Sequence, residues 1–299
     1  MQISIITATY NRAYCLDNIY QSILRNKYNE EVEWILIDDG STDNTEALAK
    51  KWSYEKKINF RYYKKSNGGK TSAIKLGFDN NPKGEFTFVL DSDDYLADNA
   101  IELILDELKG LDNKYIGIVG LKAFIDGKIV GEKFPIHESG YMNLYFGKNS
   151  ISSDKLFVIK TDIYSASWEL PIKGEKLLPE GVVYLNANSN GIYKLINEVF
   201  YYGDYLNDGL SNNVFKLAMN NINSFRYVYK RFQAEEVCLK SKFLIEAKYI
   251  HYSILCKKDF INTISYSENK AITLFMYLPV LIGLYPYRKK ILRNVRDFS

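Results

Sequence analysis

The sequence predicts an α/β protein, in which a mostly parallel sheet is flanked by helices and followed by a helical C-terminal region. Short β-rich runs alternate with helix-like stretches over about the first 90 residues, which is typical of βαβ units. After residue 110 this pattern loosens, and from residue 213 apolar and basic residues interleave at helical spacing. We therefore expect one domain over residues 1–212, divided near residue 110, and a helical region over residues 213–299.

Strands are predicted where apolar and β-branched residues form short runs. These runs cover residues 3–6, 32–37, 58–63, 86–90, 115–124 and 195–202. Helices are predicted over residues 15–24, 42–52 and 71–78. Either Ser41 or Thr42 is expected to cap the second of these helices. The pair Asp126-Gly127 is typical of a hairpin turn, so residues 128–133 are expected to return as a strand.

The composition excludes several classes of protein. Hydrophobic residues make up 46% and charged residues 25% of the chain, which excludes a disordered or collagen-like protein. The net charge of +3 gives no reason to expect nucleic-acid binding. The three cysteines are far apart and form no CxxC pair, which argues against a disulfide framework or a zinc site. No charged and apolar leader precedes the first strand, so we expect a cytoplasmic location.

Polar clusters follow four of the predicted strands, at the point where each strand ends. They are residues 7–12 (TATYNR), 38–42 (DDGST), 67–71 (NGGKT) and 91–94 (DSDD). In an open α/β sheet, ligands bind outside the carboxyl ends of the strands. The sequence therefore predicts one site at this edge, built from hydrogen-bond donors, a basic group and carboxylates.

The chemistry of these clusters fits a nucleoside diphosphate together with a divalent cation. An Asp-x-Asp spacing suits Mg²⁺ or Mn²⁺, and in an extended segment Asp91 and Asp93 would lie on the same side. The glycines before Lys70 allow the backbone to approach an anion, and Lys70 can neutralise phosphate charge. Asp39 can accept a hydrogen bond from a base or a ribose. A P-loop is excluded, because its first glycine would fall at Lys64.

The four clusters, in this order, resemble those of family 2 glycosyltransferases with the Rossmann-like GT-A fold. The resemblance implies a nucleotide-sugar-binding half over residues 1–110 and an acceptor-binding half over residues 111–212. It implies donor contacts, to a UDP-sugar in many members, from Ala8, Tyr10, Asp39, Lys70, Asp91, Ser92 and Asp93. It also implies that Asp93 binds Mn²⁺ or Mg²⁺ on the diphosphate, and that the sugar is transferred with inversion to a glycan or lipid-linked saccharide.

The resemblance also implies a general base downstream of the carboxylate cluster, where the family often has a Glu-Asp pair. This sequence lacks the pair, and the best positional match is Glu180, in the segment LPEG at the start of an expected helix. The alternative interpretation is a surface glutamate that favours the helix dipole. Glu175 and Asp162 are weaker candidates for the base. The missing pair is the only support for a second hypothesis, a catalytically inert GT-A protein that binds nucleotide or glycan beside a partner enzyme.

Two further groups of residues are candidates for contacts with substrate. Residues 205–211 resemble a family segment that closes over the diphosphate, so Asp208 and Ser211 are candidate phosphate or metal contacts; the alternative is a turn. Aromatic residues make up 15% of the chain, and some of them could stack on sugar rings in the acceptor half. The candidates are Tyr141, Tyr145, Phe146 and Trp168.

The C-terminal region carries an excess of positive charge. Residues 215–299 hold 15 Lys and Arg against 6 Asp and Glu, whereas the rest of the chain holds 24 against 30. Residues 271–287 carry no charge, but they are too short for a span of about 20 residues and contain two prolines. We expect this region to meet an anionic membrane surface at the inner face of the plasma membrane; the alternatives are packing on the catalytic domain or in a homo-oligomer. The family resemblance and the basic C-terminal region together imply an isoprenoid-diphosphate-linked acceptor for a surface polysaccharide such as a capsule.

Overall fold

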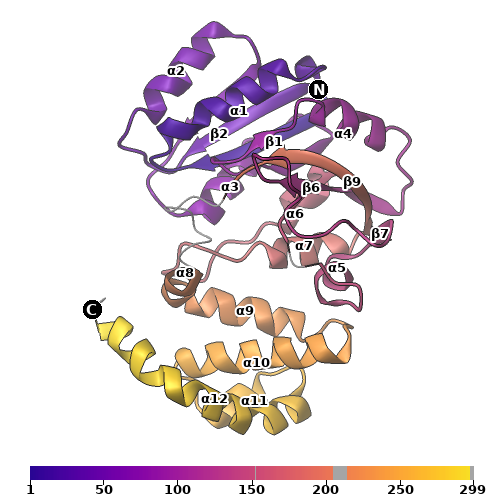
Figure 1. The fold of residues 1–299 in the computed structure, drawn as a ribbon. Coiled ribbons are helices and arrows are strands. Elements are labelled where there is room, and N and C mark those ends of the chain that lie inside the picture. Colours follow the sequence, from indigo (N-terminus) through magenta and orange to yellow (C-terminus); the bar gives the residue numbers. More distant parts are fainter. Residues whose placement is uncertain (152, 205–213, 297–299) are drawn as a thin grey trace.

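The computed structural model describes residues 1–151, 153–204 and 214–296, and their arrangement is shown in Figure 1. Within these residues, nine strands form one sheet, which is covered by helices and is followed by a separate stack of helices. This arrangement confirms the predicted α/β class and the helical C-terminal region.

The amino-terminal part of the sheet is parallel and alternates with helices, as predicted. Its strands are β1 (Ile3–Thr9), β2 (Val32–Asp38), β3 (Asn59–Lys64) and β4 (Phe86–Val89), in the spatial order β3-β2-β1-β4. The connecting elements are α1 (Ala13–Arg25), the short 3₁₀ helix η1 (Asn29–Glu31), α2 (Thr45–Glu55) and α3 (Lys70–Asp79). Every residue of β2 is buried, because helices cover both faces of the sheet.

The second part of the sheet contains a strand that the sequence did not indicate. Strand β8 (Lys155–Lys160) lies antiparallel between β4 and β6 (Tyr115–Ala123). Strand β9 (Ile192–Tyr202) follows parallel to β6, and the two-residue strands β5 (Tyr95–Leu96) and β7 (Glu138–Ser139) pair antiparallel with β9. Because β8 runs antiparallel, its amino end lies at the same edge as the carboxyl ends of β4 and β6.

Two local predictions are wrong. The chain does turn at Asp126-Gly127, where the backbone N–H of Phe124 donates to the carbonyl of Lys128 at 2.8 Å, but residues 128–133 form only a single bridge, between Ala123 and Ile129, and no returning strand. The chain then crosses to Asn197 of β9, whose amide pairs with the backbone of Phe134. Helix α2 begins three residues later than expected, after Asn44. The polar residues expected to cap it bond to Asn11 instead, and this contact is described below with the site.

In the described part of the sequence, four short helices, which were not among the predicted elements, lie between β5 and β9. They are α4 (Ala100–Leu108), α5 (Tyr141–Phe146), α6 (Thr161–Ser167) and α7 (Gly181–Asn188). Helices of two turns or so are too short to give a clear periodic pattern. They matter for function because α5 and α7 form the wall of the cavity described below.

The sheet has an apolar core on each face. Helices α1, α2 and α4 cover one core, which contains Trp34 and Trp52 with their ring centroids 5.4 Å apart. Helices α3, α6 and α7 cover the other. Trp168 belongs to this second core: it is 4% exposed and packs against Phe78 and Tyr164. The expectation that Trp168 stacks on a sugar is therefore wrong.

The C-terminal region is helical throughout the described residues. Its helices are α8 (Val214–Asn220), α9 (Ile222–Phe232), α10 (Leu239–Leu255), α11 (Phe260–Ser265) and α12 (Lys270–Arg296). Helix α9 packs against α7, and Val228 and Phe232 of α9 join the core beside the sheet. In the part of the chain that the structure describes, no helix is both long and apolar enough to cross a membrane.

Candidate active site

A cavity of about 820 Å³ opens at the carboxyl edge of the sheet, between the sheet and helices α5 and α7. It collects eight residues that the sequence predicted from four separate segments and from the LPEG motif. They are Ala8, Tyr10, Asp39, Lys70, Asp91, Ser92, Asp93 and Glu180. The two remaining candidates, Asp208 and Ser211, lie outside the described residues. The structure thus brings the predicted set together, while the role of each residue stays a prediction.

The loops after β1 and β2 are tied together at one wall of the cavity. Asn11 has a left-handed backbone (φ +52°), and its backbone N–H donates to Ser41 Oγ at 2.9 Å. In return, the backbone N–H of Thr42 donates to Asn11 Oδ1 at 2.8 Å. The Asp43 carboxylate accepts from the backbone N–H of Ala13 at 2.9 Å. Ser41 and Thr42 do not cap α2 because they bond to Asn11 instead. These bonds fix the loop that presents Tyr10 to the cavity.

The Asp39 carboxylate holds the glycine loop before α3. It accepts from the backbone N–H groups of Gly68 and Gly69 at 2.9 and 2.7 Å, and from Lys65 Nζ at 2.8 Å. Gly69 has φ +92°, and a Cβ there would overlap the carbonyl oxygen of Lys176. Asp39 thus binds Lys65 and the backbone of the glycine loop, so it shapes the base of the cavity whatever it does for the nucleotide.

Lys70 joins two carboxylates that come from opposite parts of the cavity. Its Nζ lies 2.7 Å from Asp91 Oδ1 and 2.8 Å from Glu180 Oε1. Burial lowers the pKa of Lys70, but the charges of Asp91 and Glu180 outweigh burial and hold that pKa well above its usual value. Burial likewise raises the pKa of Asp91, and the ammonium of Lys70 overcomes this and lowers it. Lys70 and Asp91 are therefore both charged near neutral pH.

The segment before Glu180 is pinned to the start of α3, which places Glu180 beside Lys70. The backbone N–H of Leu178 donates to Thr71 Oγ1 at 2.9 Å. Asn221 Oδ1, at the start of α9, accepts from the backbone N–H groups of Lys176 and Leu177. Glu180 precedes α7 but its side chain caps no helix N–H; it faces the cavity, where Tyr184 donates to its Oε2 at 3.3 Å. The structure therefore does not support the alternative of a solvent-facing surface glutamate.

The two weaker candidates for the base lie elsewhere. The Glu175 carboxylate accepts from the backbone N–H groups of Asn223 and Ser224 at 2.8 and 2.7 Å, so it caps the first turn of α9. Asp162 lies in the first turn of α6, where its carboxylate accepts from the backbone N–H of Ile163. Neither residue lines the cavity.

Residues 91–94 form a turn, so the expected extended alternation is wrong. The backbone N–H of Asp94 donates to the carbonyl of Asp91 at 3.1 Å. The three carboxylates point to different partners as a result: Asp91 to Lys70, Asp93 to Arg12 Nη1 at 3.3 Å, and Asp94 to Lys122 Nζ at 3.0 Å. Only the last pair is deeply buried, and burial raises the pKa of Asp94 to about 7.

The residues present fit a divalent cation that is shared with a phosphate ligand. Asp93 lines the cavity and its Oδ2 is held only by a long contact to Arg12, so its carboxylate is available for a metal ion. Among the described residues, no group of three or more His, Cys, Asp or Glu is arranged to hold a metal. Mg²⁺ is typically bound through one or two carboxylates with phosphate and water as the other ligands. The donor set therefore suits an ion that arrives with a diphosphate.

Sequence reasoning missed a second group of cavity residues. Lys122 is the last residue but one of β6 and Lys155 begins β8, so both lie at the carboxyl edge of β4 and line the cavity. Tyr141 and Tyr145 on α5 line it too, with ring centroids 5.0 Å apart, and Tyr141 lies 5.5 Å from Tyr184 of α7. The tyrosines were expected near a sugar, but the lysines were not. The sequence did hold one signal for them, because Lys122 interrupts the otherwise apolar run of residues 115–124.

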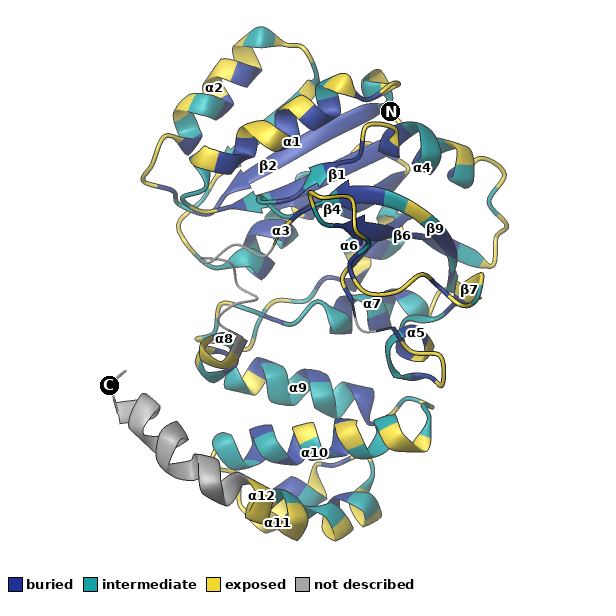
Figure 2. Cartoon of the chain, in the orientation of Figure 1, coloured by how far each residue is buried: buried dark blue, intermediate teal, exposed yellow. Residues whose placement is uncertain are grey.

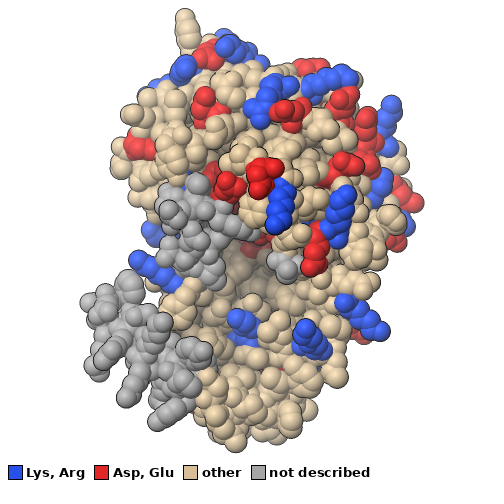
Figure 3. Space-filling view, viewed as in Figure 1, with Lys and Arg blue, Asp and Glu red and all other residues tan. Residues whose placement is uncertain are grey.

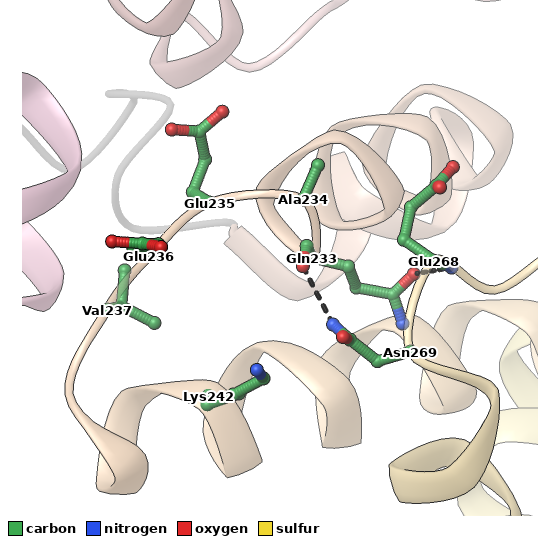
Figure 4. A pocket seen from close by; sticks show the side chains of 8 residues that line it. All are labelled: Gln233, Ala234, Glu235, Glu236, Val237, Lys242, Glu268 and Asn269. Atoms are coloured by element: carbon green, nitrogen blue, oxygen red, sulfur yellow. Dashed lines mark hydrogen bonds between the residues drawn. The ribbon is translucent and has the colours of Figure 1, made fainter.

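A second hollow, of about 500 Å³, lies at the junction of α9, α10 and α12 and shares no residue with the first (Figure 4). Its wall is mostly polar, and Asn269 Nδ2 donates to the carbonyl of Gln233 at 2.7 Å across it. The side-chain amide of Gln233 points inward and donates to the buried carboxylate of Glu246 at 2.7 Å. This hollow belongs to the polar core of the helical region.

Comparisons with known proteins agree with the geometry. The model of the family "Glycosyl transferase family 2" matches residues 4–166, more than half of the chain. An uncharacterized glycosyltransferase of Mycoplasma genitalium is 39% identical over 106 residues, which are 34% of this chain and 36% of that protein. A Rickettsia felis glycosyltransferase is 40% identical over 126 residues, which are 42% of this chain and 20% of that protein. The chain thus spans only about a third of the length of the Mycoplasma genitalium relative and a fifth of the length of the Rickettsia felis relative.

A longer match comes from Mycoplasma pneumoniae, where an uncharacterized glycosyltransferase is 26% identical over 87% of this chain and 84% of its own length. Among solved structures, the crystal structure of S. aureus TarS 1-349 in complex with UDP-GlcNAc superposes with a TM-score of 0.66. It is 15% identical and covers 97% of this chain and 92% of that one. Such a likeness establishes the GT-A fold. The chain belongs to glycosyl transferase family 2.

Proposed function

We propose that this protein is a glycosyltransferase that moves a sugar from a UDP-linked donor to a saccharide acceptor by a single displacement that inverts the anomeric carbon. The observation that carries the proposal is the Lys70 ammonium held between Asp91 and Glu180 in the cavity that also contains Asp93. This arrangement supplies a cation near a diphosphate and a carboxylate base within one site.

Glu180 is the proposed general base. Its carboxylate takes the proton from an acceptor hydroxyl as the hydroxyl oxygen bonds to the anomeric carbon. The bond from that carbon to the diphosphate oxygen breaks, and its electron pair leaves with the nucleoside diphosphate. Glu180 is suited to this role because the bonds of Leu178 to Thr71 fix its segment, and because its second oxygen is held only by a 3.3 Å contact to Tyr184.

Asp91, Asp93 and Lys70 form the proposed donor side of the site. Asp93 would hold Mn²⁺ or Mg²⁺, which when bound neutralises charge on the leaving diphosphate. A relative in fold supports a metal: the mannosyltransferase PcManGT from Pyrobaculum calidifontis was solved in complex with GDP-Man and Mn2+, with a TM-score of 0.59 and 14% identity. We propose UDP as the donor nucleotide for two reasons: the family resemblance, and the UDP-GlcNAc complex in which TarS was solved. Lys70 orients Asp91 and Glu180 and adds positive charge beside the donor.

The proposed acceptor is a glycan or an isoprenoid-diphosphate-linked saccharide of a bacterial surface polysaccharide, met at the inner face of the plasma membrane. Support comes from exposed apolar side chains on α11 and α12, which no other part of the described chain covers (Figure 2). They are Phe260, Ile261, Leu274, Phe275, Leu278, Leu281 and Ile282. On the face shown in Figure 3, charged side chains crowd over the α/β part, and the described helical region carries a few scattered lysines and arginines. Apolar side chains with basic neighbours suit an anionic interface.

Two variants test the catalytic proposal in the full chain. Glu180→Gln should bind UDP in the presence of Mn²⁺ as the wild type does, but should lose slow hydrolysis of a UDP-sugar and all transfer. Asp93→Ala should lose the metal-dependent part of UDP binding, measured by calorimetry with and without Mn²⁺. Glu175→Gln is the matched control, because its loss of the α9 cap should lower the melting temperature and leave turnover intact.

Each outcome bears on a different part of the proposal. Full activity of Glu180→Gln would assign the base to another residue. UDP binding by the wild type without any hydrolysis or transfer would favour the second hypothesis, an inert GT-A protein that binds nucleotide or glycan beside a partner. Unchanged metal dependence in Asp93→Ala would remove Asp93 from the metal site.

A further inference from the structure

Lys155 is a buried lysine in the wall of the active-site cavity. It is the first residue of β8, and the antiparallel direction of β8 brings it to the edge where β4 and β6 end. Its side chain lines the cavity and is 7% exposed. The position is therefore set by the sheet and is shielded from bulk water.

Within the part of the chain that the structure describes, the Lys155 ammonium forms no direct ion pair, although the charges of Asp154 and Glu132 act on it and oppose the effect of burial on its pKa. It donates to the carbonyl of Val130 at 3.2 Å and to Ser153 Oγ, which are both neutral. Among the described residues, no Asp or Glu forms an ion pair with it. An ammonium has three N–H donors, so one remains for a ligand. Burial lowers the pKa of Lys155 to about 8, so it stays largely charged at neutral pH.

The neighbouring lysine shows the contrast. Lys122 lies near the end of β6 at the same edge, is 5% exposed, and forms an ion pair with Asp94 at 3.0 Å. A buried charge that lacks such a partner is costly, and it persists where a ligand or a function requires it. The cavity therefore contains one lysine in a direct ion pair and one whose ammonium directly contacts only neutral groups of the described chain.

The surroundings of Lys155 suit a saccharide. Tyr145 and Tyr141 of α5 line the same cavity, and the Tyr145 hydroxyl donates to the carbonyl of Ser153, next to Lys155, at 3.4 Å. Tyrosine rings offer flat faces with a polar tip, which suit the mixed surface of a sugar. A cation beside such rings favours a sugar with a carboxylate or phosphate group.

We propose that Lys155 binds an oxyanion, a carboxylate or phosphate, carried by a saccharide substrate of this enzyme. The proposal deepens and rests on the proposed glycosyl transfer, and it makes Lys155 a specificity-determining residue for an acidic sugar or sugar phosphate. The oxyanion belongs either to the acceptor or to the sugar of the donor, and the two sources are separated by the experiment.

The first arm tests the acceptor. Full-length protein saturated with UDP and Mn²⁺ is titrated calorimetrically with methyl glucuronide, glycerol phosphate and the neutral methyl glucoside. We expect a charged probe to bind about tenfold or more tightly than the neutral one, as one charged hydrogen bond provides. Lys155→Arg should keep this preference, and Lys155→Met and Lys155→Gln should lose it. Lys109→Met, an exposed lysine at the end of α4, is the control.

The second arm tests the donor by comparing UDP-glucuronate with UDP-glucose in the same variants. A Lys155-dependent preference for the uronate in this arm alone assigns the oxyanion to the donor sugar. A purely structural role for Lys155, in bonding Val130 and Ser153, predicts that Lys155→Gln restores whatever Lys155→Met loses. Such a rescue, or equal binding of charged and neutral probes in both arms, would overturn the proposal.

Failure of the proposed function has a different signature. The first arm is repeated without UDP, so that a Lys155-dependent preference for methyl glucuronide can be seen even if the protein binds no nucleotide. Absence of UDP binding with an intact preference would refute the proposed transfer and keep the oxyanion site. Normal UDP binding without any preference for charged over neutral probes would refute the oxyanion site and leave the proposed transfer intact.

Discussion

Lys70 and Glu180 form an ion pair of 2.8 Å between residues that are 110 positions apart in the chain. Lys70 begins α3 in the nucleotide half, and Glu180 directly precedes α7 in the second half. The pair links the part of the cavity that is proposed to hold the donor to the residue proposed to activate the acceptor. Its removal should therefore affect both steps.

Lys70→Met should lower turnover by roughly a hundredfold or more and weaken UDP binding, because the site loses the cation between two carboxylates. The steady-state rate with a UDP-sugar and the calorimetric affinity for UDP measure the two effects. Lys75→Met, one turn later on α3, removes a surface ion pair with Asp79 and should change neither by more than about twofold. Equal effects of the two substitutions would show that Lys70 has no special role.

Gly69→Ala should destabilise the protein by about 3 kcal/mol or more and abolish UDP binding, because its Cβ would overlap the carbonyl oxygen of Lys176 at a positive φ. Gly174→Ala is a close control: this glycine has the same φ of +92°, but a Cβ there meets nothing within 4 Å. It should cost only the backbone strain, about 1 kcal/mol. Urea unfolding measures both, and similar losses would show that contact with Lys176 is unimportant.

Glu246→Gln should raise the free energy of unfolding at pH 8, because it removes the cost of ionising a buried carboxyl. Burial raises the pKa of Glu246, although hydrogen bonds from Thr273 and Gln233 oppose the shift, and one carboxylate oxygen has no partner. Because the pKa in the folded state is above that in the unfolded state, wild-type stability is fullest below about pH 4.5 and falls as pH rises through the raised pKa. Gln does not titrate and keeps the same acceptor.

The advantage of Glu246→Gln should therefore shrink as pH falls from 8 toward 4.5. Urea unfolding at several pH values measures it, with Glu236→Gln, an exposed residue, as the control. A pH-independent difference between wild type and Glu246→Gln would mean that the buried carboxylate is not the cause.

Phe275→Glu with Leu278→Glu should abolish flotation with liposomes that contain anionic lipid, since both side chains lie on α12 and are 74% and 61% exposed. Neither should change UDP binding, because α12 lies far from the cavity in the fold (Figure 1). Tyr54→Glu replaces an aromatic residue on α2 that is 88% exposed, and it serves as control. If the wild type does not float, or the double variant floats as well as it does, the membrane proposal fails.

The amino-terminal half could be predicted almost completely because its signals are local. Short apolar runs mark each strand, and polar residues follow at the shared edge, so Asp39, Lys70 and Asp93 are found from the chain order alone. Strand β8 could not be found in this way. It has only four apolar residues between two lysines, and its pairing with β4 and β6 is decided by tertiary contacts.

The same limit applies to the candidate site. Glu180 was found because its segment matched a family position, but its contact with Lys70 depends on bonds from Thr71 and Asn221 to the preceding loop. Lys155 was missed because a lysine at the edge of an apolar run usually reaches solvent. The placement of Trp168 was wrong for the opposite reason: an aromatic residue in a loop-like stretch proved to be core.

The antiparallel strand β8 also determines how this enzyme can change shape. Its hydrogen bonds to β4 on one side and β6 on the other make the two halves one continuous sheet. The halves therefore cannot swing apart about a hinge, as two domains joined by a linker do. Opening and closing during turnover must be confined to the connections at the carboxyl edge, so substitutions that stiffen those loops should slow substrate exchange without weakening the scaffold.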